Sequence, residues 1–188
     1  RELPGAGLAQ RLDRDASGLL LIGRSSAALR ALGGAMESGA ITREYVAIVH
    51  GELADERRTI DLALRVTDEP RGDRPKTVVD AAGLPAVTHV TRLATRRAAT
   101  LVRVRIETGR THQIRAHLAA IGHPLLGDAR YGDAAANEKA RATFGVERAL
   151  LHAVRLVFPR PTGGASIDVR AAWPADFLRL FPHAARDA

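Results

Sequence analysis

The sequence contains no cysteine, only two lysines and no long apolar run. Without cysteine the chain can form no disulfide, no thiolate zinc site and no thiol nucleophile. No apolar run approaches the roughly 20 residues that a membrane-spanning helix requires, and the N-terminus lacks a signal-peptide pattern. We therefore expect no membrane partner and a cytoplasmic location.

Positive charge is abundant and comes almost entirely from arginine. The net charge is +7 and the isoelectric point is about 11, yet Lys76 and Lys139 are the only lysines. A basic chain attracts polyanions, of which nucleic acid is the commonest. Coding bias toward arginine and alanine explains the composition equally well. Arginine nevertheless binds phosphate and stacks on bases better than lysine does.

The chain length predicts a single domain over residues 1–188. Such a chain can bury roughly 70% of its unfolded surface, so it needs no disulfide or metal for stability. We expect a monomer. The chain begins at Arg1 rather than at a methionine, which is consistent with missing upstream sequence, including the N-terminal part of the fold.

Residue periodicity predicts many strands and few helices. In the stretch 99–108, Val102, Val104 and Ile106 alternate with charged residues, as in a half-buried antiparallel strand. Further strands are expected at 18–23, 43–50, 59–65, 86–95, 150–158 and 166–171. Helices are expected at 25–38, 111–122, 137–143 and 174–181, and a surface loop at 68–74. Strands and helices do not alternate regularly, so we expect an α+β fold with a mostly antiparallel sheet.

Asp13 and Asp15 belong to a polar segment, residues 13–18, that has three interpretations. A calcium loop of the EF-hand type is excluded because Arg24 stands where the closing glutamate is required. A metal-binding Asp-x-Asp of a sugar transferase rests on two residues alone. A plain turn before a strand explains the residue types. It does not explain Arg11 and Arg14 beside the carboxylates.

A second polar segment, residues 109–117, suggests that an anion is held near a helix start. Arg110 precedes the expected helix and Arg115 lies in its first turns, although the helix dipole disfavours a cation there. A phosphate or a carboxylate nearby would explain both arginines. His112 and His117 are five residues apart, not the four that place two metal ligands on one helical face, so we expect no metal site.

Three motifs occur in order, at residues 11–21, 43–51 and 108–118, the last containing Thr-His-Gln-Ile-Arg. Together they resemble the RluA-type pseudouridine synthases, which isomerise uridine in ribosomal or transfer RNA. The resemblance extends from about Leu8 to Phe181. It implies the pseudouridine synthase fold: a central mixed, mostly antiparallel sheet flanked by helices, with a cleft. The S4-like RNA-binding domain that often precedes this fold is not in this chain.

The resemblance also implies roles for individual residues. Asp13 would be the anionic partner of ribose C1′, as a covalent nucleophile or as electrostatic support, and proton abstraction at C2′ is a third option. Arg115 would stabilise its charged form, and Tyr45 would stack on the uracil and help the C5 proton leave. The residues expected to contact RNA are Arg11, Arg14, Arg110, His112 and Gln113. The target uridine would have to be flipped out of the folded RNA. The isomerisation transfers no electron and no phosphate, so neither a cofactor nor a metal is expected.

Two departures from the family pattern support an alternative. The family usually has histidine at the position of Gln10 and threonine at the position of Ala16, and both positions flank Asp13. Either substitution removes a group that could orient the carboxylate. The alternative is an RNA-binding protein that keeps the fold but is catalytically impaired. Both hypotheses require Asp13 and Arg115 to touch at the floor of a pocket large enough for one nucleotide.

Overall fold

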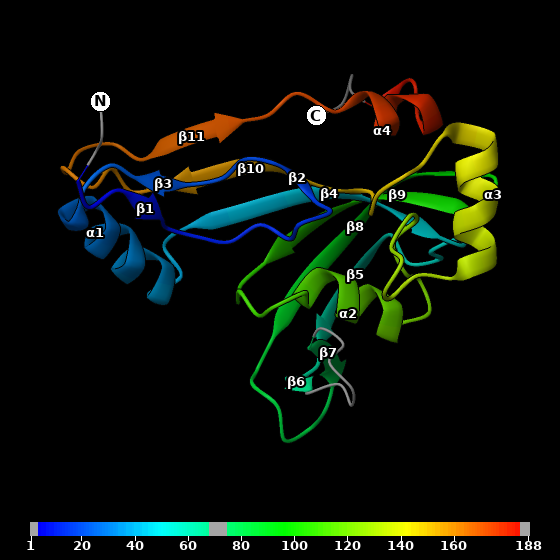
Figure 1. Ribbon diagram of the computed structural model, residues 1–188, viewed down its shortest axis with the longest axis horizontal. Coiled ribbons are helices and arrows are strands. Elements are labelled where there is room, and N and C mark those ends of the chain that lie inside the picture. The colour runs from blue at the N-terminus through cyan, green and yellow to red at the C-terminus, as the bar shows by residue number, and fades with distance from the viewer. Residues whose placement is uncertain (1–3, 68–74, 185–188) are drawn as a thin grey trace.

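The computed structural model describes residues 4–67 and 75–184, which are organised around one central sheet. Its strands lie in the order β11 (Ile167–Arg170), β10 (Leu151–Phe158), β4 (Thr42–His50), β9 (Ala99–Ile106), β8 (Val87–Arg96) and β5 (Arg57–Asp61) (Figure 1). Every pairing along this path is antiparallel. The short strand β2 (Ser17–Gly18) adds a parallel pairing with β10. The expected mixed, mostly antiparallel sheet is confirmed.

Two small antiparallel pairs accompany the central sheet. One joins β1 (Gly7–Leu8) to β3 (Ile22–Gly23). The other joins β6 (Leu64–Thr67) to β7 (Lys76–Val79) and projects from the sheet on the side of helix α2 (Gln113–Ala120) (Figure 1). Leu64, Ala86 and Ala116 form a small core between this second pair and α2.

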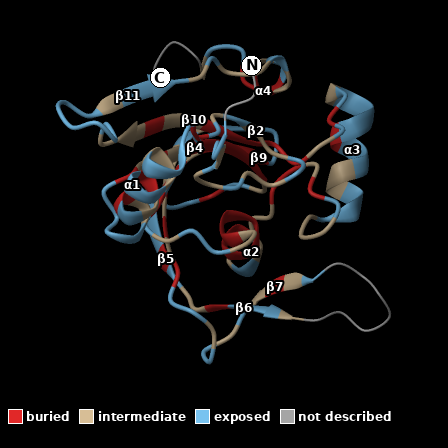
Figure 2. Ribbon diagram, turned by 60° about the vertical axis from the view of Figure 1, so that its left-hand side comes forward, coloured by how far each residue is buried: buried red, intermediate tan, exposed pale blue. Residues whose placement is uncertain are grey.

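Alternation along β4 gives the sheet two buried faces. Tyr45, Ala47 and Val49 face a core that includes Ile114 and Leu118 of α2. The intervening Val46 and Ile48 face a second core, which α3 (Ala134–Phe144) and α4 (Ala175–Leu180) cover. Figure 2 shows the buried residues concentrated along the strands and in α2. The predicted strand at 43–50 and its alternation are confirmed, and the predicted helices at 137–143 and 174–181 are present.

Helix α1 (Ser26–Glu37) lies where the sequence predicts it. The Ser25 side chain accepts a hydrogen bond from the Ala28 amide at 3.2 Å and so caps the first turn. Gly39, with φ +72°, follows the last turn. Leu32 and Ala35 bury the inner face of α1 against a third core.

The expected buried strand at 18–23 is wrong. The chain pairs with β10 only at β2, crosses to the N-terminal pair, and rejoins a sheet at β3. Gly18 approaches the Ala153 backbone so closely, at φ +106°, that no side chain fits there. Leu20 and Ile22 are 41% and 54% exposed, whereas Leu21 is buried. The run of apolar residues therefore misled the prediction, because this segment is buried on one side only.

Two further predictions need correction. The expected strand at 59–65 is divided between β5 and β6, because the chain leaves the central sheet after Asp61. Helix α2 begins at Gln113, two residues later than the predicted range 111–122. His112 occupies the N-cap position in a left-handed conformation, with φ 50°, and the Thr111 hydroxyl accepts a hydrogen bond from Arg11. The loop expected at 68–74 lies outside the described residues. Across residues 4–67 and 75–184, every helix is too short or too polar to cross a membrane.

Candidate functional site

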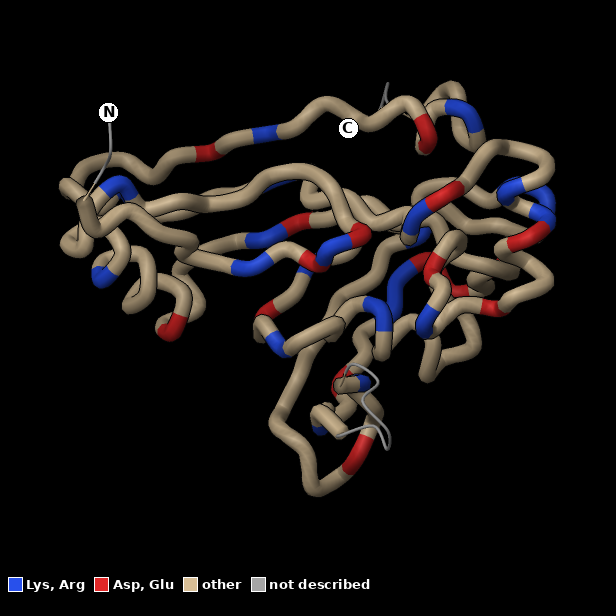
Figure 3. Tube along the Cα trace, in the orientation of Figure 1, with Lys and Arg blue, Asp and Glu red and all other residues tan. Residues whose placement is uncertain are grey.

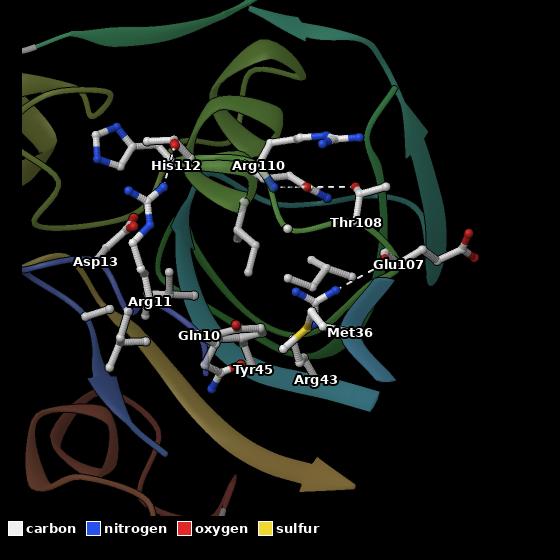
Figure 4. A pocket seen from close by; sticks show the side chains of 18 of the residues that line it. Gln10, Arg11, Asp13, Met36, Arg43, Tyr45, Glu107, Thr108, Arg110 and His112 are labelled. Carbon is white, nitrogen blue, oxygen red and sulfur yellow. Dashed lines mark hydrogen bonds between the residues drawn. The ribbon is translucent and has the colours of Figure 1, made fainter. Parts of the chain in front are cut away.

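A cavity of about 690 Å³ opens on the α2 side of the central sheet. Its walls come from the loop at residues 9–16, the start of β4 and the segment from the end of β9 into α2. The three segments that the sequence singled out, although far apart in the chain, therefore line one cavity. In Figure 4, Arg11, Asp13 and His112 lie on one side of this cavity and Met36, Arg43 and Glu107 on the other.

Asp13 and Arg115 touch, as the sequence predicts. The Arg115 Nη1 atom lies 3.3 Å from the Asp13 Oδ2 atom. The Arg115 side chain is 6% exposed, whereas the Asp13 side chain is 24% exposed and lines the cavity. The guanidinium thus lies beneath the carboxylate and leaves it open to an incoming ligand.

Asp128, which the sequence analysis did not single out, is the second partner of Arg115. Its Oδ2 accepts from Arg115 Nε at 2.7 Å, and its Oδ1 accepts from Arg115 Nη2 at 2.9 Å. The Arg130 and Tyr131 amides also donate to Oδ1, at 2.9 and 3.0 Å. This fork fixes the guanidinium and leaves Nη1 for Asp13. A buried arginine needs a buried acid as its partner, and this need was the signal that could have led to Asp128 in the sequence.

The charges of this pair are mutually stabilised. Burial alone would raise the pKa of Asp128, but the hydrogen bonds and charge of Arg115, with the two amides, hold it below the usual 3.8. Burial likewise opposes the charge of Arg115, but its two carboxylate partners raise its pKa above the usual range of an arginine. Asp128 is therefore ionised, and Arg115 protonated, at neutral pH.

Tyr131 lies beside Arg115 and contacts His112, which lines the cavity. The Arg115 guanidinium carbon lies 5.0 Å from the centre of the Tyr131 ring, within reach of a cation–π interaction. The Tyr131 hydroxyl accepts from the Thr77 amide at 2.9 Å and lies 3.1 Å from His112 Nδ1. Burial lowers the pKa of His112 below 6.5, Asp13 opposes this, and Arg115 adds to it. His112 is therefore neutral at pH 7.

Tyr45 lies on the β4 face that borders the cavity and is 8% exposed. Burial raises its pKa above 10.0, with Arg43 opposing and Asp13 adding to the shift. Its ring is thus a neutral phenol beside the Asp13 carboxylate. An aromatic face next to an open acid can hold a planar ring, such as a nucleobase, against the site.

Three of the arginines predicted to bind RNA lie around the cavity. Arg11, Arg14 and Arg110 are exposed and line its opening. Arg11 Nη2 donates to the Thr111 hydroxyl at 2.9 Å, and Arg110 Nε donates to the Pro85 carbonyl at 3.0 Å. Figure 3 shows Lys and Arg residues on most segments of the chain, several of them on those that meet here. The three guanidinium groups keep further donors for a ligand.

Gln113 does not fit its predicted contact with RNA. It is 3% exposed, and its amide nitrogen donates to the Val87 carbonyl and to the Thr88 hydroxyl, both at 3.0 Å. Its amide oxygen accepts from the Thr108 hydroxyl and the Arg110 amide. Both hydrogens and both lone pairs are used within the protein. Gln113 instead fastens the start of α2 to β8.

His117 extends the same network. Its ring nitrogens lie 2.9 Å from the Thr88 hydroxyl and 2.9 Å from the Leu62 carbonyl. Burial lowers its pKa below 6.5, so the neutral ring can donate to Leu62 and accept from Thr88. The second polar segment therefore has two functions: His112 lines the cavity and Arg115 holds Asp13 there, while Gln113 and His117 fix the start of α2.

The two positions that depart from the family pattern leave Asp13 in place. The Ala16 amide donates to the Asp13 carbonyl at 3.0 Å and closes the turn that presents the carboxylate. The Ala16 side chain packs against the core beneath the cavity. Gln10 lines the cavity wall. Within the described residues, no cluster of three or more potential metal ligands is found.

Comparisons with known proteins give a consistent result. The sequence profile described as RNA pseudouridylate synthase matches residues 2–120. Ribosomal large subunit pseudouridine synthase D of Vibrio vulnificus is 38% identical over 197 residues, covering 100% of this chain and 58% of that protein. The protein of that name from Haemophilus ducreyi is 37% identical, covering 95% and 56%. This chain thus spans little more than half the length of these relatives.

A solved structure is also similar. Human RNA pseudouridylate synthase domain containing 1 aligns with a TM-score of 0.75 and 28% identity, covering 90% of this chain and 70% of the human one.

Proposed function

This chain belongs to the RNA pseudouridylate synthase family, and we propose that it converts uridine to pseudouridine in structured RNA. Ribosomal RNA is the first substrate to test, because two relatives that match nearly the whole chain are named for the large ribosomal subunit. The observation that carries the proposal is Asp13, open to the cavity and held from beneath by an arginine that Asp128 fixes.

Asp13 is proposed as the group that acts on the sugar. The reaction breaks the bond between uracil N1 and ribose C1′, turns the base and joins its C5 atom to C1′. As N1 departs, C1′ becomes electron-poor, and an adjacent carboxylate supports it by bonding to it or by its charge. Of the three acids that line the cavity, Asp13, Glu37 and Glu107, only Asp13 is paired with a buried guanidinium.

Tyr45 is proposed to hold the uracil by stacking while the base turns. Its raised pKa keeps it a neutral phenol, which makes it a weak proton acceptor at neutral pH. Stacking on its ring is therefore the stronger of the two functions suggested for it. The C5 proton that must finally leave would need a more basic acceptor, such as water or a carboxylate, with the phenol as a relay.

We propose that the residues around the opening of the cavity bind RNA phosphates. These contacts would offset the few kcal/mol required to flip a nucleotide out of the folded RNA. Arg11, Arg14 and Arg110 are placed for this around the opening, and His112 can offer a ring nitrogen beside Asp13. The cavity volume lies within the roughly 300–1,000 Å³ typical of sites that enclose small ligands. Gln113 is not included, because its amide is fully engaged.

Replacing the carboxylate tests the proposal. We expect D13N to lower pseudouridine formation in large-subunit ribosomal RNA transcribed in vitro by on the order of a thousandfold, because the charge at C1′ is lost. Nucleoside chromatography of digested RNA measures the product. The matched control is D15N, since Asp15 is exposed in the same loop. It should retain activity within about threefold.

Other outcomes would contradict the proposal. RNA binding by the wild-type protein without any pseudouridine would favour the impaired RNA-binding protein suggested by Gln10 and Ala16. Sugar transfer that a chelator abolishes would favour a metal held by Asp13 and Asp15. Pseudouridine formation that D13N leaves intact would place the chemistry elsewhere in the molecule.

A further inference from the structure

Arg43 is a buried arginine in the cavity wall for which the described residues provide no acidic partner. It is 6% exposed and lies two residues before Tyr45, on the same face of β4. Its Nη2 donates to the Glu107 backbone carbonyl at 3.1 Å, drawn as a dashed line in Figure 4. Its Nε is buried and has no hydrogen-bond partner. Over the described ranges, no carboxylate pairs with it.

Two other arginines of this chain show how unusual this arrangement is. Arg115, equally buried, contacts both Asp13 and Asp128. Arg155 pairs with Glu44 and Asp168. Glu107, an acid of the cavity wall, does not pair with Arg43, because its carboxylate lies 2.6 Å from His89 Nε2. Burial accordingly lowers the pKa of Arg43 from the usual range of an arginine.

The backbone around Arg43 leaves room for its guanidinium. A Cβ atom at Gly109 would lie 2.6 Å from Arg43 Nη1, so a larger residue there would displace the guanidinium from its present position. Gly109 opens the segment that carries Arg110 and His112 into the cavity. A glycine beside a buried, unpaired cation indicates that the cation has a function, because a buried charge without a partner destabilises a fold.

We propose that Arg43 binds a backbone phosphate of the RNA next to the uridine that enters the cavity, an inference that rests on the proposed function. A phosphate carries a negative charge that can pair with Arg43, for which the described residues provide no acid. Its oxygens accept hydrogen bonds from the paired N–H groups of a guanidinium. The edge of the uracil ring is uncharged, so it would leave the positive charge of Arg43 without a counter-charge. Arg43 would thus position the nucleotide while Asp13 acts on it.

The substitution R43M tests this, because methionine keeps the unbranched apolar part of the side chain and removes the charged guanidinium. A buried charge replaced by an apolar residue of similar size usually leaves stability unchanged or higher. We expect R43M to melt at or above the wild-type temperature. We expect its affinity for in vitro transcribed large-subunit ribosomal RNA to fall about tenfold or more. The slope of log affinity against log salt should fall by about 0.7–0.9, the loss of one phosphate contact.

The matched control is R170M, which removes the same charge from an exposed position on β11. Its RNA affinity and salt slope should stay close to wild type. In turnover assays R43M should raise KM more than it lowers kcat, whereas R43K should restore the salt slope. If R43M does not fold, R43Q replaces it, since its amide can still donate to the Glu107 carbonyl.

The outcomes separate this inference from the proposed function. If R43M and R43Q bind RNA with the wild-type affinity and salt slope, Arg43 is only structural and the inference is wrong. If the wild-type protein forms no pseudouridine but R43M still loses one phosphate contact, the proposed function fails and the phosphate site stands. A fall in kcat alone, with KM and salt slope unchanged, would also overturn the inference.

Discussion

Arg115 is the residue on which the site depends, because it bonds to two acids with different surroundings. Asp128 is buried and takes two of its nitrogens, so the guanidinium cannot turn. Asp13 takes the third and remains open to the cavity. A single arginine can therefore hold a reactive carboxylate in position without closing it off, provided that a second carboxylate fixes the arginine from behind.

A first prediction at this scale concerns Asp128. We expect D128N to lower the free energy of unfolding by about 3 kcal/mol, because it breaks a buried ion pair and leaves a guanidinium underpaired. We expect the same variant to lose most of its pseudouridine formation, since Arg115 is then free to turn away from Asp13. Urea unfolding and nucleoside chromatography measure the two effects.

The control for D128N is again D15N, which removes an exposed carboxylate and should change stability by less than about 0.5 kcal/mol. A D128N protein with wild-type stability and full activity would show that Asp13 does not need a fixed Arg115. Loss of stability with full activity at a temperature where the variant is folded would limit Asp128 to a structural function.

At the scale of elements, strand β4 and helix α2 bring the site together. The period of two along β4 places Arg43 and Tyr45 on the cavity face and Val46 in the opposite core. Helix α2 packs on this same face through Ile114 and Leu118. Its start is fixed by hydrogen bonds from Gln113 to β8 rather than by a capping hydroxyl. The loop before α2 is thus oriented by side-chain bonds.

A second prediction concerns the glycines of α1. Gly33 and Gly34 lie inside the helix, and a Cβ atom at either would meet no other atom within 4 Å. We therefore expect G33A and G34A each to raise the free energy of unfolding by about 0.5–1 kcal/mol, because alanine loses less conformational entropy in a helix. Thermal and urea unfolding measure the gain.

Gly39 provides the matched comparison. It also has open space around it, but its φ of +72° is unfavourable for alanine. G39A should lower stability by about 1 kcal/mol, so the sign of the effect depends on backbone conformation alone. Equal effects of G39A and G33A would mean that α1 does not end as described.

For the whole molecule, burial of three histidines couples stability to pH. His112, His117 and His152 each have a pKa below the usual 6.5, and burial is the largest cause in all three. Below pH 6.5 the unfolded chain binds protons at these rings while the folded protein does not. Acid therefore favours unfolding, and this contribution to stability is complete only above about pH 6.5.

A third prediction follows from this coupling. We expect the free energy of unfolding to be nearly constant between pH 8 and 7 and to fall by about 1–3 kcal/mol between pH 7 and 5. Urea unfolding at a series of pH values measures it. Asp128 does not contribute in this window, because its lowered pKa moves its loss of stability below pH 3.8. The variant H117Q should flatten the dependence, and a rise in stability toward pH 5 would refute it.

The sequence alone was sufficient to predict the family, the α+β class, most strands and the contact between Asp13 and Arg115. These depend on local patterns: alternation along 43–50 and 99–108, the Ser25 cap, and motifs that are contiguous in the chain. The residues named by the resemblance, Arg11, Arg14, Arg110, His112, Gln113 and Tyr45, all line the cavity, and their contacts with RNA stay a prediction.

The other features of the site and the fold could be established only from the three-dimensional structure, because they depend on partners far away in the chain. Asp128 became a site residue through its contact with Arg115, and Gln113 became structural because β8 lies within reach of its amide. The apolar run at 18–23 was not a strand, since Gly18 is pressed against β10. Among the described residues, no acid pairs with the buried Arg43. Such an unpaired charge can be recognised only when the surrounding residues have been placed in space.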